Sequence, residues 1–265
     1  NEIIGGSNIH VPEFDYNALS ETDKYIYDHY TVPYNVEVVY RWNQGDVSSD
    51  DMRKNLVPPR ESQVEPFLEM IEKVWMDTYT AEVGQQTLRS YIPKQLLLVG
   101  SASYNDDGST TEGTAEGGRQ IVLYSVNDFN FELEQIQSYA HVMHHEFAHI
   151  LHQNVEYDAE FEKITPSYSS SWMQMNDETA RSKGFITAYA FSSADEDFAE
   201  MVSIMLTNSP EDWDNMIENA GNAAAVEALR KKEAIVVAYM KNNWGVNMKD
   251  FQKEVVAAIE AAVRN

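Results

Sequence analysis

Two histidines and a glutamate stand at the spacing that a catalytic metal site requires. The segment His144-His145-Glu146-Phe147-Ala148-His149 contains the pattern HExxH at 145–149. On a helix, residues i and i+4 share a face, so His145 and His149 can present two imidazole nitrogens to one cation. Glu146 lies on the same side and can take a proton from a metal-bound water. The pattern predicts hydrolysis activated by one zinc ion per chain. The alternative is a structural helix with two hydrogen-bonded histidines.

A third ligand is expected from a later helix. Catalytic zinc sites commonly use two histidines and one glutamate. The class of zincins with a third histidine six residues after the second is excluded, because that position holds Val155. Glu196 and Glu200 instead lie one turn apart on an otherwise apolar helix face, where unpaired carboxylates would cost free energy. We predict Glu196 as the third metal ligand and Glu200 as the partner of a ligand histidine, His145 first. The alternative is two solvated surface acids.

The combination of HEFAH at 145–149, EDFAE at 196–200 and Tyr189 seven residues before Glu196 resembles the gluzincin pattern. These segments are similar to the catalytic domain of anthrax lethal factor. The longer stretches GFITAYAFSSADEDFAEM, HEFAHILHQ and YNVEVVYRW resemble the substrate-import-associated zinc metallohydrolase lipoproteins of the Bacteroidetes, a family of zinc-binding metallopeptidases. This second resemblance extends over most of the chain from about residue 18.

The resemblance implies a zinc metallopeptidase that acts on a peptide or protein substrate. In it Glu146 would be the general base, and the Tyr189 hydroxyl would stabilise the oxyanion, with Tyr157 and Tyr168 as substitutes. It also implies a lipid-anchored cell-envelope protein near a TonB-dependent import complex, with the anchoring cysteine preceding Asn1. Two other functions stay open: a zinc-containing binding or processing subunit of the import system with little peptidase activity, and a hydrolase of a non-peptide amide or ester.

The amino-acid composition excludes several kinds of partner and of site. The 19 Lys and Arg against 43 Asp and Glu give a net charge of −24, which repels phosphate backbones, so we expect no nucleic-acid partner. The chain has no cysteine, which excludes disulfides and thiolate metal sites within it. No apolar stretch approaches the ~20 residues of a membrane span, so the membrane contact that we expect is only the lipid anchor implied by the resemblance.

The elements that position these residues predict an α+β, zincin-like fold. Strands are expected at 35–42, 95–99 and 119–126, with a polar loop at 105–118. Two helices are expected in the first half, at 20–30, where Pro33 stops the helix, and at 61–83. Beyond Asn130 the chain is expected to be mainly helical, at 132–153, 195–207, 210–219, 222–243 and 247–262. An irregular segment at 156–194 separates the first two of these later helices. We predict a tether at 1–17 and one metallopeptidase domain at 18–265, its lobes at about 18–155 and 156–265 meeting at the active-site cleft.

Two further predictions concern the surroundings of the metal. The strand at 119–126 is expected at the sheet edge, where an extended peptide could add by main-chain hydrogen bonds, the alternative being a plain core strand. His141, His144 and His152 flank the HExxH segment, and we interpret all three as bystanders, with His152 near the cleft and His141 able to extend the ligand face.

Overall fold

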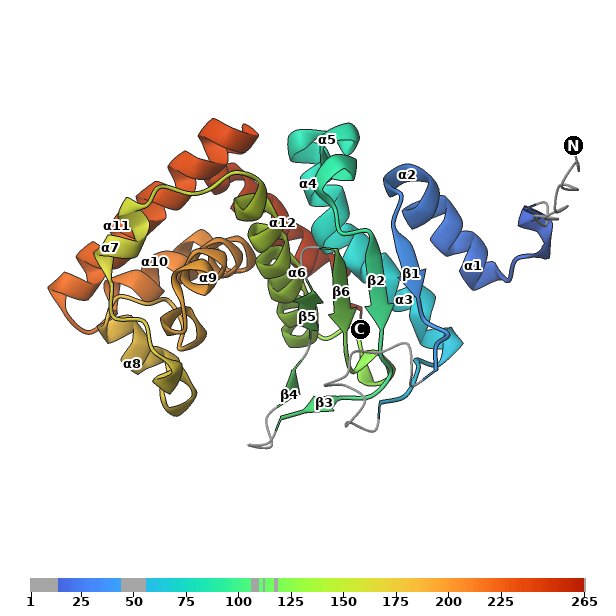
Figure 1. Ribbon diagram of the computed structural model, residues 1–265, viewed down its shortest axis with the longest axis horizontal. Coiled ribbons are helices and arrows are strands. Elements are labelled where there is room, and N and C mark those ends of the chain that lie inside the picture. The colour runs from blue at the N-terminus through green and yellow to red at the C-terminus, as the bar shows by residue number, and fades with distance from the viewer. Residues whose placement is uncertain (1–13, 44–55, 106–109, 112, 117–118, 265) are drawn as a thin grey trace, which may run out of the picture.

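The computed structural model describes residues 14–43, 56–105, 110–111, 113–116 and 119–264. A small mixed sheet occupies the N-terminal half, and the C-terminal half is helical. Helix α6 (Leu133–Asn154) runs between the sheet and the helices of the second half (Figure 1). The predicted α+β class is therefore confirmed.

The main sheet has four strands in the order β1-β2-β6-β5. Strands β1 (Glu37–Val39), β2 (Gln95–Leu98) and β6 (Gln120–Leu123) are parallel, and β5 (Gly113–Glu116) pairs antiparallel with β6. Parallel neighbours need a crossover connection, which α3 to α5 supply between β1 and β2. A separate pair is formed by β3 (Ser103–Tyr104) and β4 (Thr110–Thr111).

Two predictions about this sheet are wrong. The strand expected at the edge is β6, which lies between β2 and β5, and the edge strand is β5, inside the segment predicted to be a loop. The reason is that this segment is rich in glycine and offers only threonines as strand-forming residues, so its pairing depends on β6 beside it. At Gly113 a Cβ atom would come 2.4 Å from Val142 Cγ1 of α6, so this position requires glycine for close packing on the helix.

The N-terminal helices continue further than predicted. After a short 3-10 turn (Tyr16–Ala18), α1 (Glu21–Ile26) begins with the Ser20 side chain as its cap, as expected. Pro33 does not stop this helix, because a π-helical turn at 27–31 leads directly into α2 (Val32–Tyr34). The chain turns only at Asn35, which has φ of 57°.

The long helix predicted at 61–83 is present as α3 (Glu61–Ile71), a π-helical turn at 72–76 and α4 (Asp77–Val83). Gly84, with φ of 81°, separates it from α5 (Gln85–Tyr91), which was not predicted. The apolar positions that define the pattern, such as Phe67, Ile71 and Trp75, are fully buried.

The five helices predicted beyond residue 130 all form, and each begins within a residue of its expected start. They are α6, α9 (Ala194–Thr207), α10 (Pro210–Glu218), α11 (Ala223–Tyr239, followed by a π-helical turn at 240–244) and α12 (Met248–Ala262). The segment at 156–194 contains the short helices α7 (Glu160–Ile164) and α8 (Asp177–Ser182) and two 3-10 turns.

Helix α6 packs along α9, and this interface belongs to the main core. The fully buried Phe198 of α9 packs against the His152 ring of α6, with ring centroids 5.9 Å apart. The polar residues of the two predicted metal segments lie in the same interface, so the apolar pairing of the helices is what brings them together. No helix in the described ranges has the length and apolar character needed to cross a membrane.

A buried ion pair fixes α11 to α9. Lys232 Nζ lies 2.5 Å from Asp197 Oδ2 and donates to the carbonyl oxygen of Gly184 at 2.8 Å, and both charged side chains are fully buried. Most of the predicted tether, residues 1–13, lies outside the described residues; Phe14 stacks on Tyr27 with ring centroids 4.9 Å apart. The division into one domain with two lobes stays a prediction.

Candidate metal centre

Two facing helices present the predicted site residues. His145, Glu146 and His149 are on α6, and Glu196 and Glu200 are on α9. The start of α9 is set by Ser193, whose hydroxyl accepts a hydrogen bond from the Glu196 backbone N–H at 3.3 Å. This cap places Glu196 in the first turn and Glu200 one turn further along the same face.

Three side-chain atoms converge on one point between the helices. His145 Nε2 and His149 Nε2 each lie 3.0 Å from Glu196 Oε2, and the two nitrogens are 3.1 Å apart. Ligands held about 2.0–2.2 Å from a tetrahedral zinc ion would be separated by about 3.3 Å. The identity and spacing of these donors fit a zinc ion that is bound by His145, His149 and Glu196.

The charges around His145 support this fit. Burial alone would lower the pKa of His145, but the Glu196 and Glu200 carboxylates on either side raise it to about 10. Burial would likewise raise the pKa of Glu196, but hydrogen bonds from His145 and His149 lower it to about 2. The position between the three atoms therefore favours positive charge, which a divalent cation would supply in place of a proton.

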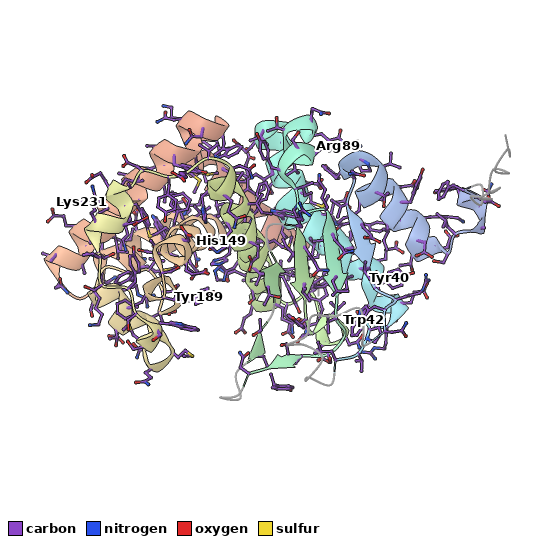
Figure 2. The ribbon with its side chains drawn as sticks, viewed as in Figure 1. Tyr40, Trp42, Arg89, His149, Tyr189 and Lys231 are labelled. Carbon is purple, nitrogen blue, oxygen red and sulfur yellow. The ribbon has the colours of Figure 1, made fainter. Side chains whose placement is uncertain are left out.

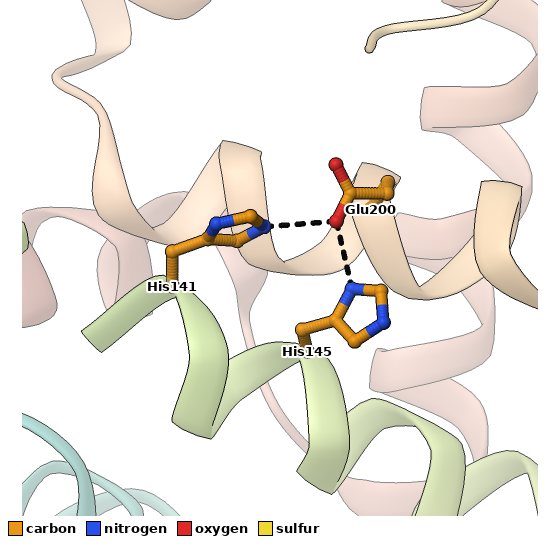
Figure 3. Close-up of side chains that lie close together, drawn as sticks. All are labelled: His141, His145 and Glu200. Carbon is orange, nitrogen blue, oxygen red and sulfur yellow. Dashed lines mark hydrogen bonds and ion pairs between the residues drawn. The ribbon is translucent and has the colours of Figure 1, made fainter. Parts of the chain in front are cut away.

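Glu200 is only 2% exposed, and its carboxylate contacts three other side chains. Its Oε1 lies 2.8 Å from both His145 Nδ1 and His141 Nε2 (Figure 3). Its Oε2 accepts a hydrogen bond from the Thr187 hydroxyl at 2.6 Å. Burial acts to raise the pKa of Glu200, but His141 and His145 outweigh it and hold the pKa well below its usual range. Glu200 thus remains charged and faces the side of His145 opposite Glu196.

Within the described residues, two groups have the residue types and proximity of a metal site: His145, His149 and Glu196, and also His141, His145 and Glu200. They share His145 through opposite ring nitrogens. In each group both histidine nitrogens approach one carboxylate oxygen, at 3.0 Å from Glu196 Oε2 in the first and 2.8 Å from Glu200 Oε1 in the second. The donor types of both groups therefore suit a cation, and the first group contains the two histidines of the HExxH segment.

Glu146 and Tyr189 lie beside the convergent atoms. Burial raises the pKa of Glu146, whereas the nearby His145 and His149 oppose the rise. The Tyr189 ring centroid is 5.8 Å from that of His145, and Figure 2 shows Tyr189 on the chain segment that faces α6. Burial and the negative charge of Glu196 raise the pKa of Tyr189, so its hydroxyl keeps its proton and can donate a hydrogen bond.

The two alternatives to Tyr189, Tyr157 and Tyr168, hydrogen-bond to other acids. The hydroxyl of Tyr157 donates to Asp195 at 2.8 Å, and that of Tyr168 donates to Asp197 at 3.0 Å. The acidic neighbour of Tyr189 is instead Glu196, one of the three convergent groups, and the Tyr189 residue is 37% exposed.

The flanking histidines have three different environments. His144 is a bystander: its ring is fully buried, its Nε2–H donates to the Val74 carbonyl at 3.2 Å, and burial lowers its pKa to about 3. His141 is the second donor to Glu200, and His152 Nε2 lies 2.9 Å from His149 Nδ1. The sequence places His141 on the ligand face and His152 near the cleft, but we interpreted both as bystanders and did not predict these two contacts.

Comparisons with known proteins agree with this geometry. A protein family described as "Putative zinc-binding metallo-peptidase" matches residues 16–249. A crystal structure from Bacteroides caccae that carries the same description is similar to the chain with a TM-score of 0.78 and 32% sequence identity. The match covers 92% of this chain and 95% of the other. None of the curated proteins that were compared matches the chain significantly.

Proposed function

Because the chain belongs to this family of zinc-binding metallo-peptidases, we propose that it is a gluzincin-type peptidase with His145, His149 and Glu196 as its zinc ligands. The observation that carries the proposal is the convergence of the two imidazole nitrogens and one carboxylate oxygen at 3.0–3.1 Å. Glu146, which follows the first ligand directly, is the further residue that makes this donor set suitable for hydrolysis rather than for structure alone.

When bound, zinc would supply a Lewis acid that polarises a carbonyl group and lowers the pKa of a bound water. Glu146 would accept the proton of the attacking water and then transfer it to the leaving amine. The burial that raises the pKa of Glu146 makes it a stronger base than an exposed carboxylate, which suits the first of these transfers.

Tyr189 would stabilise the oxyanion. Its hydroxyl stays protonated, lies near Glu196 and His145, and can donate to the oxygen on which negative charge develops. Glu200 would contribute indirectly, by accepting the Nδ1–H of His145 and so orienting the ring that offers Nε2 to the metal.

We also propose, from the family resemblance, a location in the cell envelope beside a nutrient-import complex. The first test of this location is fractionation of the source cells, with the chain expected in the membrane fraction and released by detergent. Recovery in the cytosolic fraction would contradict it.

The experiment that tests the catalytic proposal is digestion of a diverse peptide library by zinc-loaded protein, read by mass spectrometry beside Glu146→Gln. Wild-type protein is expected to cleave and the variant to lose cleavage while it retains zinc. Cleavage by both proteins would remove Glu146 from the mechanism. Zinc binding without cleavage by either would instead favour a binding subunit or a hydrolase of a non-peptide amide or ester.

A further inference from the structure

His152 is the fourth histidine on the ligand face of α6, after His141, His145 and His149, and it has no role in the function proposed above. It follows His149 by three residues, and its residue is only 7% exposed. Its Nε2 lies 2.9 Å from Nδ1 of His149, which is hydrogen-bond distance. The two rings meet nearly edge to face, with centroids 5.1 Å apart and an interplanar angle of 67°.

The hydrogen-bonding capacity of imidazole determines which ring donates. His149 Nε2 faces Glu196 and His145, and is the nitrogen that would bind the metal. A neutral imidazole that binds a metal through Nε2 carries its proton on Nδ1, so His149 must donate in the contact with His152. His152 Nε2 is then the acceptor, and its own proton is on Nδ1.

The His152 ring is held by residues outside α6. It packs edge-on against Tyr157 and Phe198, with centroid distances of 5.5 and 5.9 Å. Its Nδ1 faces Asp195 Oδ1 at 4.0 Å, and the same oxygen accepts the Tyr157 hydroxyl at 2.8 Å. The ring is thus fixed in orientation by α9 and by the segment that follows α6.

We propose that His152 is a positioning residue that holds the His149 ring by accepting its Nδ1–H. In this arrangement each ligand histidine has its own acceptor, Glu200 for His145 and His152 for His149. The two acceptors differ in charge. Glu146, Glu196 and Glu200 already bring three carboxylates to the site, and a neutral imidazole orients the second ring without adding a fourth.

This inference rests on the proposed metal site, and its test is zinc affinity rather than activity. The dissociation constant is measured by chelator competition for wild type, His152→Phe and His152→Gln. Phe fills the site without an acceptor, whereas the longer Gln can place its amide oxygen where Nε2 now lies. Loss of a supporting partner typically weakens metal binding about 10–100-fold. We expect that loss with Phe and recovery of most of the affinity with Gln.

Two further measurements separate positioning from a general loss of structure. The absorption bands of the cobalt-loaded protein report ligand geometry, and they should shift in His152→Phe but not in His152→Gln. His144→Phe makes the same change at a buried histidine on another face of α6 and should leave zinc affinity unchanged. If His152→Phe does not fold, His152→Asn replaces it, because the shorter amide cannot reach His149.

Wild-type affinity and an unshifted cobalt spectrum in the Phe or Asn variant would overturn the role of His152 and leave the proposed function intact. Equal losses in the Gln and Phe variants would also overturn it, since the acceptor would then be irrelevant. Failure of the wild-type protein to bind zinc at all would instead overturn the proposed function.

Discussion

Removal of the Glu200 carboxylate tests which of the two overlapping residue groups binds the metal. Its Oε1 lies 2.8 Å from the nearest nitrogens of both His141 and His145, and Oε2 accepts from Thr187 at 2.6 Å. Glu200→Gln keeps one oxygen that can face both histidines, and the new amide group can donate to the Thr187 hydroxyl. Orientation of the ligand ring is then largely preserved, and mainly the negative charge is lost.

Glu200→Ala removes both the accepting oxygen and the negative charge. It leaves the Nδ1–H of the His145 ring, which is only 8% exposed, without an acceptor. Supporting partners of metal ligands are typically worth 10–100-fold in affinity, or about 1.4–2.7 kcal/mol. We expect zinc affinity to fall about tenfold in the Gln variant and about 100-fold in the Ala variant. The assay is chelator competition, with the exposed Glu254→Gln of α12 as a control that should bind as wild type does.

Either of two outcomes would refute this reasoning. Wild-type affinity in Glu200→Ala would show that the carboxylate does not support His145. Abolished binding in Glu200→Ala, together with retained binding in Glu196→Ala, would identify His141, His145 and Glu200 as the metal ligands. The donor geometry on which the proposed function rests would then be wrong.

Four other changes test neighbouring parts of the site and the core. Glu196→Ala should lower the zinc content below one ion per chain on elemental analysis, and unchanged stoichiometry would exclude it as a ligand. Tyr189→Phe should reduce kcat about 10²–10³-fold with little change in KM, whereas unaltered kcat in steady-state assays would exclude an oxyanion role. Removal of zinc should lower the Tm, since zinc at 100 times its Kd stabilises the fold by about 2.7 kcal/mol, and an unchanged melting curve would contradict this. Lys232→Met should destabilise the fold by about 3–5 kcal/mol in urea unfolding because it leaves Asp197 buried and unpaired. Addition of Asp197→Asn should recover part of that loss, and equal destabilisation by the single and double variants would argue against the ion pair.

Local geometry explains why the predicted site residues of each helix lie on one face. His145 and His149 share a helix face because the helical period places i and i+4 together, and Glu196 and Glu200 follow the same rule. The helix that carries Glu196 begins where a serine can cap it, and this cap is also a local feature. The amphipathic pattern of α6 and α9 further indicated that these faces are buried, so the partners of the carboxylates had to come from another element.

The features that depend on the tertiary structure involve residues whose partners are distant in the chain. The edge strand β5 has a glycine-rich sequence and exists because β6 pairs with it. The difference among the three tyrosines depends on which acid each contacts: Asp195 for Tyr157, Asp197 for Tyr168 and Glu196 for Tyr189. The acceptor role of His152 likewise requires α9 to pack against its ring. Helical period and capping depend on residues a few positions apart, so they can be predicted from the sequence. Strand pairing and long-range hydrogen-bond partners depend on how the whole chain packs.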